Sequence, residues 1–171
     1  MNSRILLAVG AVLVFGIVNW KVAGKERLRT AGQTVFLDLA PRDPRSLMQG
    51  DYMALNFAVA RDIGSQVSSD EQRLRVAVLS LNEKRVAVFR RLDAGEPLSP
   101  GEVRFRFRVR NGAVWLGTNA FFFHEGDEER YRAARFGEFR VNEDGDAMLV
   151  DLRDKELQKM MGIASPSARK M

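Results

Sequence analysis

The segment Val103–Arg110, VRFRFRVR, has the most regular pattern in the chain. Apolar residues occupy its odd-numbered positions and arginines occupy the even-numbered ones. Successive side chains of a β-strand point to opposite faces, so this alternation predicts a strand with one buried and one solvated face. Asn111-Gly112 follows and predicts a two-residue hairpin turn, because both residues of such a turn need a positive φ. The pattern therefore favours an antiparallel sheet.

The arginine face of this strand has two interpretations. The strand that returns after the turn is expected to form the cross-strand pairs Val109 with Val114, Arg108 with Trp115, and Phe107 with Leu116. Trp115 then lies on the arginine face, where a cation–π contact is favourable. The face is either a site for phosphate or another anion, or a solvated sheet surface balanced by nearby acids, and we favour the solvated surface. The candidate anion-binding residues are Arg104, Arg106, Arg108, Arg110 and Trp115.

The segment Val35–Ala60 is predicted to form a strand, a tight connection and a second strand. The first strand is expected to run from Val35 to Ala40, since apolar residues alternate there. Asp43 and Pro44 are typical of a helix start, which predicts a single helical turn over 45–49 that ends at Gly50. A second strand is expected over 52–59.

The remaining body is also expected to be rich in strands. Predicted hairpins pair 74–81 with 85–92 and 138–141 with 147–152, with a surface loop or short helix at 62–72 and a loop at 93–101. Helical turns are expected over 127–135 and 154–161. The fold class is thus α+β, mostly antiparallel β as a sheet or a partly open barrel or sandwich, with one or two short helices. The expected domains are an N-terminal membrane anchor (1–24), a linker (25–33), a β-rich domain (34–161) and a disordered tail (162–171).

The N-terminal anchor is predicted from Ile5–Ala23, a stretch of 19 residues that is free of charge up to Lys21. A bilayer-crossing helix needs about 17–25 residues, so we expect one transmembrane helix that contacts the lipid bilayer through residues 5–23. Trp20 and Lys21 suit the interface. A cleaved signal peptide is the alternative, although the cleavage site would be poor. The four basic residues that follow the span outnumber Arg4 before it, so the positive-inside rule places the C-terminal domain in the cytoplasm.

Catalytic chemistry finds little support in the composition. The chain has no cysteine and one histidine, which excludes thiolate chemistry and cysteine-based metal sites. His124 has no second nitrogen or sulfur donor to share a transition metal. The net charge of +5 is spread along the chain, so nucleic acid is not an expected partner. We nominate no catalytic residue, no metal site and no cofactor. Whether the protein is an enzyme stays open, and we favour a protein that is not an enzyme.

The chain resembles the GDYXXLXY family of bacterial membrane-anchored proteins. The motifs that carry the resemblance are PRDPRS at 41–46, GDYMALNF at 50–57, GTNAFFF at 117–123, EG at 125–126 and ARFGE at 134–138. Phe57 stands where the family name has tyrosine, which implies a packing role at that position. The motif residues that we expect to be structural are Asp43, Pro44, Arg45, Gly50, Asp51, Tyr52, Leu55 and Phe57. The resemblance implies an inner-membrane anchor with the domain in the periplasm, against the charge count, and says nothing about a reaction.

Two functional hypotheses follow. The first is a non-enzymatic accessory domain, tethered to the inner membrane and facing the periplasm, that acts with an integral membrane protein partner. The second is an envelope enzyme or binding domain that recognises an anionic ligand through Asp51, Tyr52 and the face of Arg104–Arg110. Burial separates them: a buried motif indicates a scaffold, whereas a pocket that joins Tyr52 to the arginines indicates a ligand site.

Overall fold

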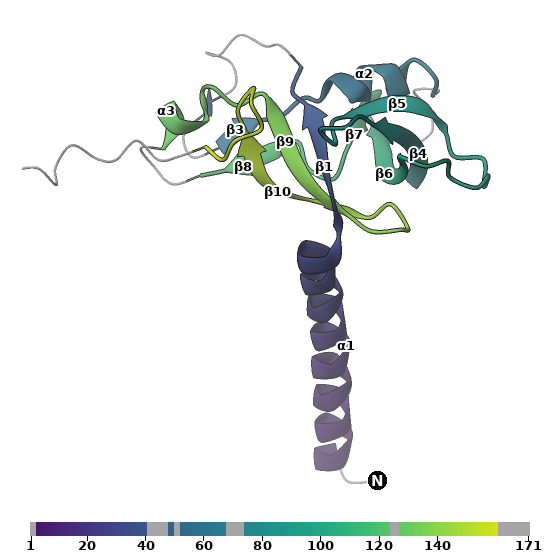
Figure 1. The fold of residues 1–171 in the computed structure, drawn as a ribbon. Coiled ribbons are helices and arrows are strands. Elements are labelled where there is room, and N and C mark those ends of the chain that lie inside the picture. Colours follow the sequence, from purple (N-terminus) through teal and green to yellow (C-terminus); the bar gives the residue numbers. More distant parts are fainter. Residues whose placement is uncertain (1–2, 41–47, 50–51, 68–73, 124–126, 161–171) are drawn as a thin grey trace, which may run out of the picture.

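The structure, a computed structural model, describes all residues except 1–2, 41–47, 50–51, 68–73, 124–126 and 161–171. Helix α1 (Ser3–Ala31) projects as a long stalk from one side of a β-rich domain (Figure 1). Gly32 alone separates α1 from the first strand, β1 (Gln33–Asp38). A Cβ at Gly32 would collide with the carbonyl oxygen of Leu28, so this connection requires glycine.

Helix α1 exposes apolar side chains over much of its length. The large exposed apolar residues in its described part are Val12, Leu13, Val14, Phe15, Ile17, Val18, Trp20 and Val22. Among residues whose side chains the structure describes, which begin at Gly10 in this helix, no helix has the length and apolar character needed to cross a membrane. The predicted N-terminal helix is present and continues through 25–31, whereas its crossing of a membrane is not supported by this finding and stays a prediction.

Three antiparallel sheets form the domain. The first has the order β1-β9-β10, with β9 at Phe136–Val141 and β10 at Ala147–Arg153. The second has the order β2-β3-β8, with β2 at Met48–Gln49, β3 at Tyr52–Ala54 and β8 at Ala120–Phe122. The third has the order β5-β4-β6-β7, with β5 at Ala87–Leu92, β4 at Leu74–Leu81, β6 at Glu102–Arg110 and β7 at Ala113–Trp115. Two short helices complete the domain, α2 (Ala58–Gly64) and α3 (Glu128–Tyr131).

One hydrophobic core joins the sheets. The ring of Phe139 in β9 lies edge-on to Phe105 of β6 at 5.4 Å and to Phe57 at 5.3 Å. Gly137 faces the same rings, and a Cβ there would come within 2.9 Å of the Phe57 ring. The predicted class of antiparallel β structure with short helices is confirmed.

The prediction for Val35–Ala60 was wrong in two places. Met48 and Gln49, expected in a helical turn, form strand β2 and pair with β3. The strand expected over 52–59 ends at Ala54, and helix α2 begins at Ala58. Val59 and Ile63 explain the helix, because they are four residues apart and both are buried in the core.

The hairpin predictions are confirmed by the β4–β5 and β9–β10 pairs. The helix expected over 127–135 is shorter, since α3 spans only Glu128–Tyr131. The helical turn expected over 154–161 was wrong for the part of it that is described. The carboxylate of Asp154 accepts hydrogen bonds from the backbone N–H groups of Glu156 and Gln158, which builds a turn there. The predicted tail, 162–171, lies outside the described residues.

Candidate functional site

Strand β6 supplies most of the candidate anion-binding residues, and it has the predicted geometry. Val103, Phe105, Phe107 and Val109 are buried in the core, so the arginines face outward. The turn that follows has positive φ at Asn111 (49°) and Gly112 (73°), as predicted. The ladder with β7 pairs Val109 with Val114 and Arg108 with Trp115, whereas the third predicted pair falls beyond the end of β7.

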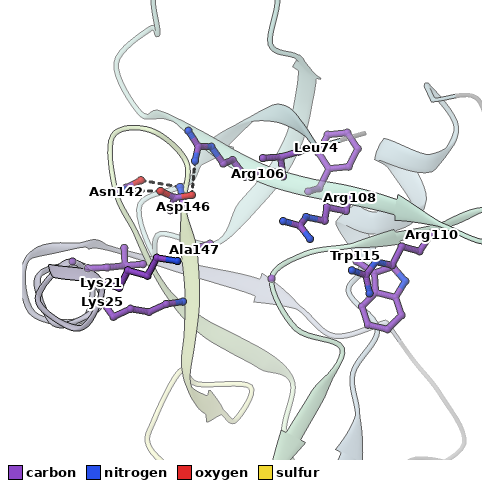
Figure 2. Close-up of a pocket in the computed structure, with 14 residues that line it drawn as sticks. Lys21, Lys25, Leu74, Arg106, Arg108, Arg110, Trp115, Asn142, Asp146 and Ala147 are labelled. Atoms are coloured by element: carbon purple, nitrogen blue, oxygen red, sulfur yellow. Dashed lines mark hydrogen bonds and ion pairs between the residues drawn. The ribbon is translucent and has the colours of Figure 1, made fainter. Parts of the chain in front are cut away.

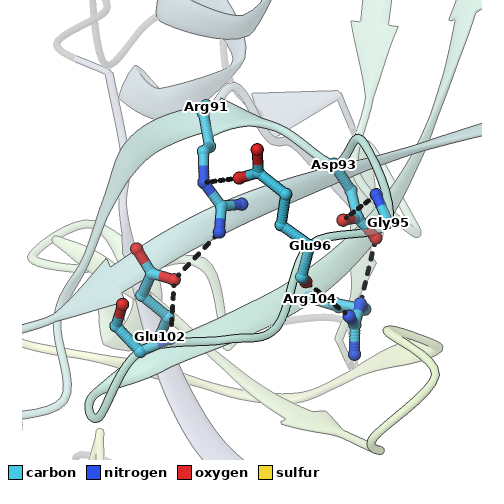
Figure 3. Close-up of polar contacts among 7 residues, drawn as sticks. Arg91, Asp93, Gly95, Glu96, Glu102 and Arg104 are labelled. Atoms are coloured by element: carbon cyan, nitrogen blue, oxygen red, sulfur yellow. Dashed lines mark hydrogen bonds and ion pairs between the residues drawn. The ribbon is translucent and has the colours of Figure 1, made fainter.

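Arg104 lies in a network of acids at one end of β6 (Figure 3). Its Nε donates to Asp93 Oδ2 at 2.9 Å, and its Nη2 donates to the backbone oxygen of Glu96 at 3.2 Å. Burial raises the pKa of Asp93, but the backbone N–H of Gly95 and the Arg104 guanidinium outweigh it, so this pKa is below its usual 3.8. Asp93 is therefore ionised at neutral pH and balances the charge of Arg104.

Arg106 also has an acidic partner. Its Nη1 lies 2.6 Å from Asp146 Oδ1, in the turn between β9 and β10. The backbone N–H of Arg106 donates to the carbonyl oxygen of Gly145 at 2.8 Å. Asn142 holds Asp146 in place, since its Oδ1 accepts from the Asp146 backbone N–H at 2.8 Å. The tip of the β9–β10 hairpin thus closes over the middle of β6.

Arg108 and Arg110 differ from these two. Both side chains are exposed, and neither has an acidic partner within the described part of the chain. Arg110 lies over the ring of Trp115, with its Cζ 5.7 Å from the ring centroid. This contact confirms the predicted cation–π pair, although the prediction placed no particular arginine there.

A groove of about 780 Å³ lies between this end of β6 and helix α1 (Figure 2). Five basic side chains and one acidic side chain line it: Lys21, Lys25, Arg106, Arg108, Arg110 and Asp146. Trp115, Leu74 and Asn142 contribute to its walls. Figure 2 shows the two lysines extending from α1 toward the β-domain and Arg108 reaching into the space between them and Trp115. The groove is therefore strongly cationic.

The lysines of this groove were not predicted as part of a site. Lys21 and Lys25 are four residues apart, which places them on one face of α1. That spacing was visible in the sequence, but nothing in the sequence indicated that this face meets β6. Asp146 and Asn142 reach the groove in the same way, through the β9–β10 hairpin.

The signature motif lies elsewhere. Leu55 and Phe57 are buried in the core. Tyr52 is half-buried in β3, and its ring lies 5.8 Å from that of Phe122. The motif residues Asp43, Pro44, Arg45, Gly50 and Asp51 lie outside the described residues. Tyr52 does not line the groove with the arginines, so the structure does not bring this residue of the second hypothesis together with the arginine face.

In the described segments, no three histidine or acidic side chains are grouped so that they could hold a metal ion. His124 is outside those segments.

Fold and site together define an antiparallel β-domain on a helical stalk, with a cationic groove at their junction. The chain belongs to the GDYXXLXY family, whose model, described as GDYXXLXY protein, matches residues 14–152. The match begins inside α1 and ends in β10. Comparisons with curated proteins and with solved structures returned no match.

Proposed function

We propose that this protein is a non-enzymatic interaction domain, held at the bacterial inner membrane by α1 and acting in the periplasm with an integral membrane protein. The observation that carries the proposal is the exposed apolar surface of α1. Water-exposed helices ordinarily have one polar face, and large exposed apolar surfaces mark contacts with lipid or protein. Trp20, the most exposed of these side chains at 82%, stands at the end of the apolar stretch.

The sequence before Gly10 supports membrane insertion. Residues 5–9, ILLAV, are apolar and belong to the same helix by backbone. Together with the exposed apolar residues from Val12 to Val22, they make a stretch of the length that a bilayer requires. Trp20 and Lys21 then lie at the end of the stretch, where interfacial tryptophan and lysine are common.

The burial of Leu55 and Phe57, two residues of the signature motif, supports a scaffold role for that part of it. Leu55 and Phe57 pack in the core, and the Phe57 ring contacts Phe139 of strand β9. Buried residues of this kind determine the shape of a domain. They therefore act on partner binding only indirectly, through the surface that the domain presents.

Alkaline carbonate extraction of membranes tests the anchor. The full-length chain is expected to stay in the pellet, whereas the variant Val14→Arg/Ile17→Arg is expected in the supernatant, because each central arginine costs about 3 kcal/mol of insertion free energy. Lys25→Gln is the matched control and should remain in the pellet. Extraction of the unaltered chain would contradict the proposal.

The absence of cysteine offers a clean test of orientation. Lys84→Cys places one thiol in the exposed β4–β5 turn of the β-domain. Ser3→Cys places one at the N-terminal end of α1, the end that is farther from the β-domain along the chain. In intact spheroplasts, a membrane-impermeant maleimide should label Lys84→Cys and leave Ser3→Cys unlabelled. The reverse pattern would put the domain in the cytoplasm, as the positive-inside rule predicts.

Capture of the full-length chain from mild detergent tests the partner. We expect an integral membrane protein to co-purify with it. Recovery of the chain alone, together with hydrolytic activity, would contradict the non-enzymatic assignment.

A further inference from the structure

We infer that the groove between α1 and β6 binds the phosphate headgroup of an anionic phospholipid. This inference rests on the proposed membrane anchor and assigns a ligand to the surface next to it. Its observations are the cationic lining of the groove, the lack of an acidic partner for Arg108 and the lysines among the described residues, and the place of the groove along α1.

The charges in the groove are unevenly neutralised. Arg106 is paired with Asp146 at 2.6 Å. In the portion of the chain that the structure describes, Arg108, Lys21 and Lys25 have no acidic partner, although all three line the same groove. Several uncompensated cations around one concave space create a positive potential that concentrates anions. The groove thus favours an anionic occupant.

The donor types suit a phosphodiester. Arg108 presents a planar guanidinium, which binds two phosphate oxygens at once, and lysine ammonium groups act as point charges from the opposite side. Trp115 lines the groove beside Arg108, and its amphipathic ring is of the kind that is enriched at headgroup level. A headgroup needs both features, because it has a charged phosphate next to an apolar glycerol and chain.

The position of the groove selects a lipid over a soluble anion. Lys21 lies directly after Trp20, at the proposed membrane interface, and it also lines the groove. The helix from Lys21 to Ala31 rises only about 15 Å. Attraction of a basic residue to an anionic membrane acts within a Debye length, about 8 Å at physiological ionic strength. Lys21 and Lys25, one helical turn apart, therefore lie within reach of the headgroups.

The test uses the full-length chain with Trp20→Phe in a zwitterionic detergent, which leaves Trp115 as the only tryptophan. Trp115 emission is followed while short-chain phosphatidylglycerol, short-chain phosphatidylcholine or inorganic phosphate is added. We expect saturable binding of phosphatidylglycerol, and much weaker binding of the other two. Equal binding of both lipids would overturn the inference, and equally tight binding of inorganic phosphate would assign the groove to a soluble anion instead.

Charge variants localise the binding. Lys25→Gln/Arg108→Gln should weaken phosphatidylglycerol binding about 30-fold, since each basic residue contributes about 1 kcal/mol near an anionic lipid surface. The matched control, Lys84→Gln/Arg90→Gln, removes the same charge from exposed positions outside the groove and should leave the dissociation constant unchanged. Asp146→Asn should tighten binding about fivefold. Equal weakening by both double variants would overturn the inference.

The two proposals fail separately. A chain that resists carbonate extraction and shows no preference for phosphatidylglycerol keeps its anchor and loses the headgroup site. A chain that carbonate extracts loses the anchor, and with it the lipid assignment of the groove.

Discussion

The two ends of strand β6 carry the same repeated sequence pattern and have different surroundings. At one end Arg104 is bound by Asp93 and the Glu96 backbone, and in the middle Arg106 is bound by Asp146 at the edge of the groove. At the other end Arg108 and Arg110 face an open groove beside α1. The alternation determines which face of the sheet the arginines occupy. The loops and hairpins that pack over that face determine whether each charge is structural or free to bind a ligand.

A cavity in the core beneath strand β6 should have the largest effect on stability. Phe105 is fully buried beneath β6 and contacts Phe139. Phe105→Ala should lower the free energy of unfolding by about 3–5 kcal/mol, because it leaves a cavity in the core. Urea unfolding of the full-length chain in detergent measures this loss. A loss below about 1 kcal/mol would show that β6 is not anchored through this ring.

Straining the turn at the open end of β6 should have the next largest effect. Gly112 has a φ of 73°, where an L-residue with a Cβ is disfavoured. Gly112→Ala should therefore cost about 1–2 kcal/mol of stability. Trp115 belongs to the strand that this turn aligns, so its emission should change as well. Ala113→Gly is the control, because it changes the residue next to the turn without changing the residue that has the positive φ.

Neutralising the acid at the closed end should have the smallest effect and a distinct pH dependence. The pKa of Asp93 is lowered in the folded state, so its stabilising contribution is present above its unfolded pKa and is lost as the pH falls through the folded pKa. Asp93→Asn should therefore be less stable than the unaltered chain by up to about 1 kcal/mol at neutral pH. The difference should shrink as the pH falls below the usual carboxyl pKa of 3.8 and disappear once the pH is below the lowered pKa of the folded state. Urea unfolding at a series of pH values measures it, and a constant difference would contradict the Arg104–Asp93 pair.

Local patterns predicted the parts of this fold that depend on neighbours in the chain. The β6–β7 register followed from strict alternation and from Asn111-Gly112, whose backbone preferences leave few alternatives. The segment after Ala54 was harder to predict. Its apolar residues alternate up to Val59 as in a strand, but the buried pair Val59 and Ile63 has helical spacing, and packing against the core decides in favour of the helix.

The candidate site shows the same division. The arginine face and Trp115 were predicted because they belong to one hairpin. The lysines of α1 and the hairpin acid Asp146 were not, because tertiary packing brings them to β6 from distant parts of the chain. The separation of Tyr52 from the arginines has the same cause, since the two lie in different sheets.

Gly32, the single residue between α1 and β1, couples the orientation of the helix to that of the β-domain. The N–H of Gly32 still donates to the Leu28 carbonyl, and Arg140 of β9 donates to the Gly32 carbonyl, so the last helical turn is bonded on both sides of Gly32. A tilt of the stalk is consequently transmitted to the sheets as a swing.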